Sequence, residues 1–277
     1  REKRAIVTTW IDLANAYGSV RHNLVQFALN WYHVPPYLQA LIFYYYERLS
    51  AFVTTSSWTT GCFLFDIGLF QGCVLSTILF DCVFNLLLDC LSPLRELGFT
   101  LSCGVRTMEK AYADDLNVTT RRAVDNQRVL DRMVEWLQWS VTMRTKPRKS
   151  VHLAFRQFKG KLPSGGYTPL RDTVYSPYDA QLTIDGEHVR CLSDAEPIAE
   201  FCTEHFKFLG RWLRSDLSEK AVKAKVVKEY WERIATVAMC GVNGLMKLWL
   251  YQFSVLPFMS WPFLIHDFDL SFVESLC

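Results

Sequence analysis

Three aspartates are the residues of this sequence best suited to chemistry, and they come from two distant places in the chain. Asp12 follows a β-branched and aromatic stretch, and Asp114 and Asp115 stand about 100 residues later, after Tyr112 and Ala113. Carboxylates on two neighbouring strands can hold divalent cations that activate an attacking hydroxyl and stabilise a leaving pyrophosphate. Oxygen ligands favour Mg²⁺, or Mn²⁺, over zinc. The alternative is that Asp12 caps a helix and that the pair are solvated turn residues, because aspartate is common in turns.

The elements around these aspartates follow from the periodicity of apolar residues. Residues 5–13 predict a strand, so Asp12 lies at its end. Adjacent residues on extended backbone point to opposite faces, so only one of Asp114 and Asp115 is expected to face Asp12 directly. Further along the chain we expect two helices in 20–49 separated by Pro35-Pro36, a hairpin in 52–69 turning at Thr60-Gly61 and a helix over 74–91. We then expect a hairpin over 111–120 whose turn carries Asp114 and Asp115, and an amphipathic helix over 124–141. This mixed order predicts an α+β fold.

The C-terminal part of the chain changes character. Residues 160–185 are rich in Gly, Pro, Ser and Tyr and predict a long loop or insertion. Residues 216–241 predict a helix with Ser218 as a candidate cap and an apolar residue at every fourth position from Val222. Residues 248–265 have the length and lack of charge of a membrane span, but two prolines interrupt them. We therefore predict a buried, proline-broken pair of helices there.

Basic residues are concentrated in one segment. The formal net charge of the chain is only +2, which by itself is too small to indicate a nucleic-acid partner. Residues 121–161, however, contain 11 Lys or Arg residues and three acidic ones, which gives this segment +8 and the remainder −6. A polyanion is therefore expected to bind along this segment.

The nine cysteines and six histidines are scattered along the chain. The cysteines form no CxxC pair, are odd in number and lie largely in apolar runs. This pattern favours buried reduced thiols in an intracellular protein over a disulfide framework. We therefore predict no structural metal site and, because no signal peptide opens the sequence, a location in the nucleus or cytoplasm and no secretion.

Five segments, in this order, resemble motifs A to E of reverse transcriptases. They are WIDLANAYGSVRH (10–22), GLFQGCVLSTILF (68–80), YADDL (112–116), RKS (148–150) and FKFLG (206–210). The ordered set is far more specific than any single member, and the resemblance covers nearly the whole chain. The FKFLG segment, and Leu-Tyr-Gln followed by Leu-Pro near the C-terminus, are particularly similar to enzymes of non-LTR (LINE-like) retrotransposons.

The resemblance implies a polymerase palm, an antiparallel sheet backed by helices, over residues 1–205. It implies a primer grip and a mainly helical thumb over residues 206–277. The family's fingers, whose basic residues hold the triphosphate, are expected to be mostly missing. Asp12, Asp114 and Asp115 would be the catalytic, metal-binding carboxylates, with Mg²⁺ or Mn²⁺ as the cofactor.

Further roles follow from the same resemblance. Tyr17 is expected to exclude a ribose 2′-OH, and its alternative is a packed core aromatic. Gln71 and Gly72 are expected to lie against the incoming nucleotide and template, and their alternative is an ordinary strand-to-helix turn. Lys149 falls where the family has a lysine that protonates pyrophosphate, although a clustered charge run is usually a solvated face. The expected primer grip consists of Phe206, Lys207, Phe208, Leu209 and Gly210. The alternative is that its aromatic residues belong to the core.

The sequence departs from the family pattern at several positions. Val74 and Thr77 stand where motif B has prolines, and Gly18 stands where motif A often has an acidic residue. Lys146 replaces the asparagine frequent in motif D, and Lys110 precedes Tyr112 where apolar residues are commoner. None of these changes removes a metal ligand, so they indicate divergence.

The leading hypothesis is an RNA-directed DNA polymerase, in which a primer 3′-hydroxyl attacks a dNTP and releases pyrophosphate. The expected partners are an RNA template, a DNA primer, their RNA:DNA hybrid and dNTPs, with phosphates and hybrid shape as the recognised features. No membrane is expected, and the sequence indicates no protein partner. The alternative is a catalytically inactive, retroelement-derived nucleic-acid-binding module or fragment. An RNA-templated RNA polymerase is disfavoured by Tyr17, since such an enzyme must admit the 2′-OH.

Overall fold

The computed structural model describes residues 5–158, 174–192, 206–209, 211–213, 220–266, 268–274 and 276. The chain divides into two compact units, Arg1–Asp194 and Ala195–Cys277. The first unit combines a central sheet with helices, and the second contains helices and one short hairpin. The predicted α+β class is therefore confirmed.

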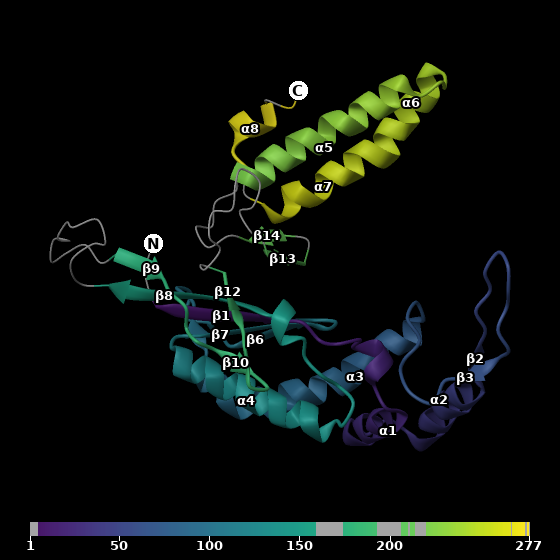
Figure 1. The fold of residues 1–277 in the computed structure, drawn as a ribbon, viewed down its shortest axis with the longest axis vertical. Helices are drawn as coiled ribbons and strands as arrows, with labels where there is room; N and C mark the ends of the chain where they lie inside the picture. Colours follow the sequence, from purple (N-terminus) through teal and green to yellow (C-terminus); the bar gives the residue numbers. More distant parts are fainter. Residues whose placement is uncertain are drawn as a thin grey trace. The chain divides into compact units, whose positions relative to one another are not determined.

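A six-stranded sheet forms the centre of the first unit, with the predicted N-terminal strand in its middle (Figure 1). The strand order is β12-β8-β1-β7-β6, and β9 also pairs with β8. The strands are β1 (Ile6–Ile11), β6 (Glu109–Tyr112), β7 (Asp115–Thr120), β8 (Val151–Phe158), β9 (Val174–Pro177) and β12 (Arg190–Cys191). β1 is antiparallel to both of its neighbours, β7 and β8, while β12 runs parallel to β8. The β-branched residues of β1 suit this central place, because they pack well on a pleated surface.

Residues along β1 and β7 alternate between a packed and an open face of the sheet. Val7, Thr9 and Ile11 are buried and the residues between them are partly exposed. β7 repeats the pattern, with Leu116 on its buried side. A side-chain period of two therefore separates the faces. α4 lies against the packed face, where the Thr9 hydroxyl donates to Asn126 Oδ1 at 2.8 Å.

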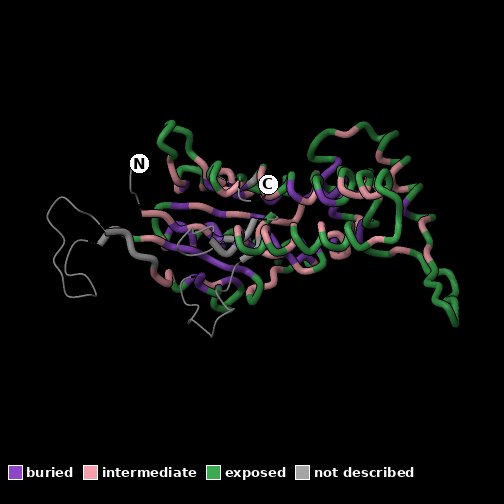
Figure 2. Tube along the Cα trace, turned by 90° about the horizontal axis from the view of Figure 1, so that it is seen from above, coloured by how far each residue is buried: buried purple, intermediate pink, exposed green. Residues whose placement is uncertain are grey.

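Helices were predicted over four stretches of the first unit, and all four are confirmed. They are α1 (His22–Trp31), α2 (Pro36–Arg48), α3 (Val74–Leu91) and α4 (Ala123–Trp139). Short 3₁₀ turns occur at η1 (Tyr17–Ser19), η2 (Ser92–Leu97) and η3 (Pro147–Lys149). α3 and α4 lie along one side of the sheet in Figure 1. In Figure 2 the buried residues are concentrated in the strands and in stretches of these helices, as expected for a single core between sheet and helices.

The segment Val74–Leu97, which contains α3, has the length and hydropathy of a membrane span. Within the described residues no other helix meets the same test, so residues 248–265 do not. Phe80, Leu87 and Leu91 of α3 are fully buried in the core of the first unit. A helix packed against both a sheet and other helices needs an apolar surface of this kind.

The first predicted hairpin turns at a different place from the one expected. β2 (Ser50–Ala51) pairs with β3 (Phe63–Leu64), and the chain reverses after Thr55, not at Thr60. The Thr55 hydroxyl accepts a hydrogen bond from the backbone N–H of Trp58 at 3.2 Å. A hydroxyl that satisfies the backbone locally can fix a turn without glycine.

The loop predicted over residues 160–185 is wrong in part. β9 falls within this stretch, β10 (Thr183–Ile184) pairs with β11 (Glu187–His188), and residues 159–173 lie outside the described residues. The backbone N–H and carbonyl of Thr183 are both bonded by the side-chain amide of Gln127 on α4, each at 2.9 Å. This tertiary anchor is invisible to composition. A further short pair, β4 (Phe99–Thr100) with β5 (Arg106–Thr107), completes the strands of the first unit.

The second unit is a small helical assembly. Its elements are β13 (Phe206–Phe208), β14 (Arg211–Leu213), α5 (Lys220–Met239), α6 (Gly244–Leu250), the π-helical turn η4 (Tyr251–Val255), α7 (Leu256–Ile265) and α8 (Leu270–Glu274). Val222 and Val226 are buried with Met259 and Leu276, so the predicted apolar period of α5 is confirmed at these two positions. The predicted cap Ser218 lies outside the described residues.

The prediction of a buried helix pair over residues 248–265 is only half right. α6, η4 and α7 are helical, with Pro262 inside α7. Leu248 and Leu264, however, are 67% and 79% exposed. A unit of this size has too little interior to bury every face of its helices.

Candidate functional site

The three predicted aspartates meet at one end of the open face of the sheet. Ile11 pairs with Leu116 in the antiparallel register of β1 and β7, and one further step places Asp12 opposite Asp115. Both point away from the buried face, because side chains alternate along a strand. Asp114 occupies the turn between β6 and β7. Strand pairing thus joins residues that lie about 100 positions apart in the sequence.

The turn that carries Asp114 is a tight two-residue connection. Tyr112 pairs with Asp115, so Ala113 and Asp114 form the turn, and Ala113 has a φ of +51°. This backbone conformation costs a non-glycine residue about 1–2 kcal/mol. The hairpin is confirmed, with one correction: Asp115 is already the first residue of β7. Backbone strain is therefore placed where the aspartates are displayed.

Asp12, Asp114 and Asp115 together form a cluster of negative charge at this end of the sheet, which we call the carboxylate corner. Partial burial raises the pKa of the Asp115 carboxyl, and the charges of Asp114 and Asp12 raise that pKa further. The Asp12 Oδ2 atom is buried and, within the described part of the chain, has no hydrogen-bond donor. A buried acceptor that receives no hydrogen bond lowers the stability of the fold by about 1–3 kcal/mol. A cation with oxygen ligands offsets both the cost and the repulsion, so these residues fit Mg²⁺ or a similar ion.

Asp12 makes three contacts with the segment that precedes β8. The Lys146 backbone N–H donates to the Asp12 carbonyl at 2.8 Å, and the Asp12 N–H donates to Ser150 Oγ at 3.2 Å. The ammonium of Lys146 lies 3.9 Å from Asp12 Oδ2. Lys146 is therefore a cation next to the carboxylates.

Lys149, the lysine predicted from the motif, is placed differently. It ends η3, its side chain is exposed, and within the described residues no ion pair joins it to an acidic residue. Lys146 was missed as a candidate because motif D usually has asparagine at that position. That departure was the available signal.

Tyr17, five residues after Asp12 in the sequence, packs on α3. Its ring stacks on Phe80 of α3, with centroids 4.4 Å apart and planes 13° apart. Its backbone carbonyl accepts a hydrogen bond from the Leu69 N–H at 2.8 Å. The contact with Phe80 fixes the orientation of the ring, and a partly buried ring held in this way fits both the packing role and the predicted gate.

The segment that carries Gln71 and Gly72 is bound to the Tyr17 turn. Gly68 has a φ of +93°, and a Cβ there would come within 3.0 Å of the Gly18 backbone, so two glycines allow the close approach. Gln71 and Gly72 themselves are exposed, and Gly72 has a φ of +92°. Cys73 then forms the N-cap of α3. The predicted turn from an extended segment into a helix is present, with Gln71 accessible to a ligand.

A row of polar side chains continues from the aspartates along the open face. The Asn117 amide donates to Thr8 Oγ1 at 2.8 Å, and the hydroxyls of Thr8 and Thr119 lie 3.0 Å apart. These residues share the face of Asp12 and Asp115 because they occupy alternate strand positions. Trp10 shares this face between Thr8 and Asp12, so the surface that leads away from the aspartates combines polar side chains with one aromatic ring.

The predicted primer grip lies in the second unit. Phe206 to Phe208 form β13, which pairs with β14, and Leu209 has a φ of +47°. Gly210 lies outside the described residues. The hairpin exists as the grip prediction requires, while its role stays a prediction.

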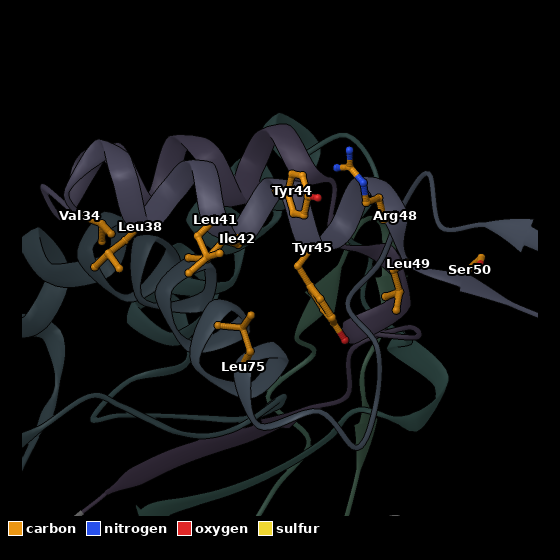
Figure 3. A pocket seen from close by; sticks show the side chains of 10 residues that line it. All are labelled: Val34, Leu38, Leu41, Ile42, Tyr44, Tyr45, Arg48, Leu49, Ser50 and Leu75. Carbon is orange, nitrogen blue, oxygen red and sulfur yellow. The ribbon is translucent and has the colours of Figure 1, made fainter.

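A groove of about 840 Å³ is lined by apolar residues of α2, among them Leu38, Leu41 and Tyr45, and by Leu75 of α3 (Figure 3). Arg48 lies toward the right-hand side of Figure 3, with Ser50 beyond it. None of the predicted catalytic or substrate-binding residues lines this groove. The carboxylate corner is thus a separate feature.

A helix-backed sheet with three carboxylates at one end of its open face indicates a class of enzyme that transfers phosphoryl groups with the help of divalent cations. Comparison with protein families gives the assignment: residues 1–213 match the family described as reverse transcriptase (RNA-dependent DNA polymerase). The chain therefore belongs to the reverse transcriptase family, which extends DNA on an RNA template and depends on divalent metal. A search of curated proteins finds no match to the chain.

Proposed function

We propose that this protein adds dNTPs to a primer 3′-hydroxyl on an RNA template, through the carboxylate corner of Asp12, Asp114 and Asp115. The observation that carries the proposal is the convergence of three carboxylates, one of them with a buried oxygen that accepts no hydrogen bond from the described residues. Such a cluster is unfavourable by itself and favourable around cations. The family match supports the same reading.

Asp12 and Asp114 would hold Mg²⁺, or Mn²⁺, with Asp115 as their neighbour. Paired cations bound there would activate the attacking hydroxyl and stabilise the pyrophosphate, as in two-metal enzymes. The chain's own contribution is to position these oxygens: Ser150 and the Lys146 backbone orient Asp12, and the strained Ala113 turn presents Asp114.

Substrate selection would fall to the surface between η1 and α3. The Tyr17 ring, held by Phe80, would exclude a ribose 2′-OH by contact. Gln71 and Gly72 are exposed beside it and would lie against the incoming nucleotide and the template. Lys149 would donate a proton to pyrophosphate, while Lys146 would hold positive charge next to Asp12 before substrate arrives.

The motifs also support a proposal for the type of element that encodes the chain and for its domain boundaries. The FKFLG segment supports a non-LTR retrotransposon, with residues 1–205 as palm and 206–277 as primer grip and thumb. The basic segment 121–161 and the polar row on the open face would contact the phosphates of template, primer and hybrid, so binding should weaken with salt. Such an enzyme would act inside the cell, in the nucleus or cytoplasm.

The decisive experiment is primer extension on an RNA template with Mg²⁺ and dNTPs. Asp114→Asn is the test variant, and Asp131→Asn, an exposed aspartate on α4, is the matched control. We expect extension by the wild type and by the control, and none by Asp114→Asn. Absence of extension in all three, with hybrid binding retained, would instead identify an inactive binding module.

A further inference from the structure

A second group of ionisable side chains lies at the other edge of the sheet, where β8 meets β12. His152 of β8, Asp179 of the connection after β9 and Cys191 of β12 place a ring nitrogen, a carboxylate oxygen and a sulfur within 4.8 Å of one another. His152 is fully buried and Cys191 is 3% exposed. His188 of β11 adjoins the group, with its Nε2 atom 3.3 Å from Asp179 Oδ2. The His152–Asp179–Cys191 cluster has the ligand types that zinc prefers.

The strand pairing preorganises this cluster. Cys191 lies directly beside His152 in the parallel register of β12 and β8, so both side chains point to the same face. His152 also pairs with Thr9 of β1, whose side chain is buried against α4. The cluster therefore occupies the helix-covered face of the sheet, opposite to the face of Asp12 and Asp115. It is a different site from the carboxylate corner.

Hydrogen bonding at His152 fixes which ring nitrogen is available. Its Nδ1 atom lies 3.1 Å from the Val189 carbonyl, which can only accept, so Nδ1 carries the hydrogen. A ligating histidine usually donates its second ring N–H to a carbonyl or carboxylate in this way. In the neutral ring Nε2 then carries the single lone pair, and this atom lies 3.1 Å from both the Ala180 backbone nitrogen and Asp179 Oδ1.

The surroundings of Nε2 are electrostatically mismatched without a cation. Asp179 Oδ1 lies 3.1 Å from Nε2, and the Ala180 backbone N–H donates to the same nitrogen at 3.1 Å. A neutral ring satisfies the Ala180 N–H but sets its lone pair against a carboxylate oxygen. A protonated ring satisfies Asp179 but buries a positive charge and faces the Ala180 N–H with a second N–H. A metal ion between Nε2 and Oδ1 would turn both acceptors into ligands, and it would take the place of the Ala180 N–H at Nε2.

The distances suit a small ion. In a four-coordinate zinc site with bonds of about 2.0–2.3 Å, ligand atoms lie about 3.3–3.7 Å from one another. The 3.1 Å separation of Nε2 and Oδ1 is already near this value. The Cys191 thiol donates to the Tyr178 carbonyl at 3.7 Å, and a modest rotation would bring its sulfur toward the same centre.

We propose that His152, Asp179 and Cys191 form a structural zinc site, with His188 or a water molecule as the fourth ligand. Binding replaces the thiol proton, which is released to solvent, and forms one Zn–S, one Zn–N and one Zn–O bond. The ion would tie β8, β12 and the connection after β9 together at the edge of the sheet. The proposal differs from the prediction, made from scattered cysteines and histidines, that the chain has no structural metal site, and zinc analysis decides between the two. Strand pairing collects residues that no sequence spacing joins.

The test measures metal binding without any polymerase reaction. The full chain is purified without chelator, its zinc content is determined, and zinc is then replaced by Co²⁺, whose thiolate charge-transfer absorption reports a Co–S bond directly. We expect close to one zinc per chain, and the charge-transfer band in the wild type. Cys191→Ser should remove the band. Cys82→Ser, which alters a half-buried cysteine of α3, should keep it.

A second variant covers the case in which Cys191→Ser does not fold. Asp179→Asn keeps the size of the side chain and should weaken zinc binding at least about tenfold while preserving the Co–S band at saturating Co²⁺. Asp114→Asn should leave the zinc content unchanged, so loss of polymerase activity and loss of this site are separable. Absence of bound zinc and of the Co–S band in folded wild type, or a band that persists in folded Cys191→Ser, would overturn the proposal.

Discussion

The two faces of the central sheet hold ionisable side chains in opposite ways. On the open face, Asp12 and Asp115 lie partly exposed, all ligand atoms are oxygen, and charges of like sign are adjacent. On the helix-covered face, His152 and Cys191 are buried, and the ligand atoms are mixed. The first arrangement suits a hard cation that exchanges together with a charged substrate. The second suits an ion that is bound permanently.

The difference follows from the pleat of the strands. At the end of β1, a shift of one residue moves a side chain from the interior, at Ile11, to the partly exposed face, at Asp12. Exposure sets how strongly a cluster interacts with water, and hence whether ligand exchange is easy. A single sheet can thereby hold a partly exposed and a buried cluster of ionisable side chains on its opposite faces.

Loss of a carboxylate on the open face should produce the largest effect. We expect Asp12→Asn to lower primer extension by about 10³-fold or more, because a lost cation ligand removes several kcal/mol of transition-state stabilisation. Single-turnover extension at saturating dNTP measures it. Folding should survive, since the substitution removes charge from a crowded corner. An active Asp12→Asn would contradict the assignment of this face to catalysis.

The limits of sequence reasoning follow the same division between local and long-range information. Periodicity identified β1, α3 and α4, because each has a regular apolar pattern and defined ends. The motif order identified the aspartates before any pairing was known. Neither signal could show that Lys146 reaches Asp12, since this depends on how the chain before β8 folds back.

The His152–Asp179–Cys191 cluster was also beyond the reach of the sequence. Its members are separated by a long stretch, and a metal-site search by spacing requires neighbouring ligands. The hairpin turn at Thr55 was misplaced for a related reason: a side-chain hydroxyl replaced the glycine that the pattern favoured. Local rules work where one interaction dominates, and they fail where tertiary contacts decide.

Paired asparagine substitutions test the two faces for stability. Asn126, fully buried, accepts from the Thr9 hydroxyl at 2.8 Å, so Asn126→Ala should cost about 2–3 kcal/mol by leaving buried groups unsatisfied. Asn117→Ala on the open face should cost less than about 1 kcal/mol, because water can replace the amide. Urea unfolding of both variants measures the difference. Equal losses would mean that the open face is not solvated.

A smaller effect separates the two lysines near the carboxylates. Lys146→Gln removes a positive charge 3.9 Å from Asp12 Oδ2, which should lower the Mg²⁺ concentration for half-maximal extension about fivefold, in keeping with roughly 1 kcal/mol for a solvated pair. Lys149→Gln is the control, and its Mg²⁺ dependence should match the wild type. If Lys149→Gln changed the Mg²⁺ dependence and Lys146→Gln did not, Lys149 would be the lysine whose charge acts on the aspartates.

The smallest effect concerns the pH dependence of stability in metal-free buffer. The pKa of Asp115 is raised above its ordinary 3.8 by burial and by the charges of Asp114 and Asp12. Folding therefore favours the protonated carboxyl, and the stability that this provides is complete below the unfolded pKa and is lost as pH rises through the folded pKa.

Asp115→Asn, which cannot ionise, should match the melting temperature of the wild type in acid and exceed it increasingly toward neutral pH. Addition of Mg²⁺ should reduce the gap, because the cation neutralises the open face while the helix-covered face is unaffected. A gap that is independent of both pH and Mg²⁺ would show that Asp115 does not share its charge with the other two aspartates.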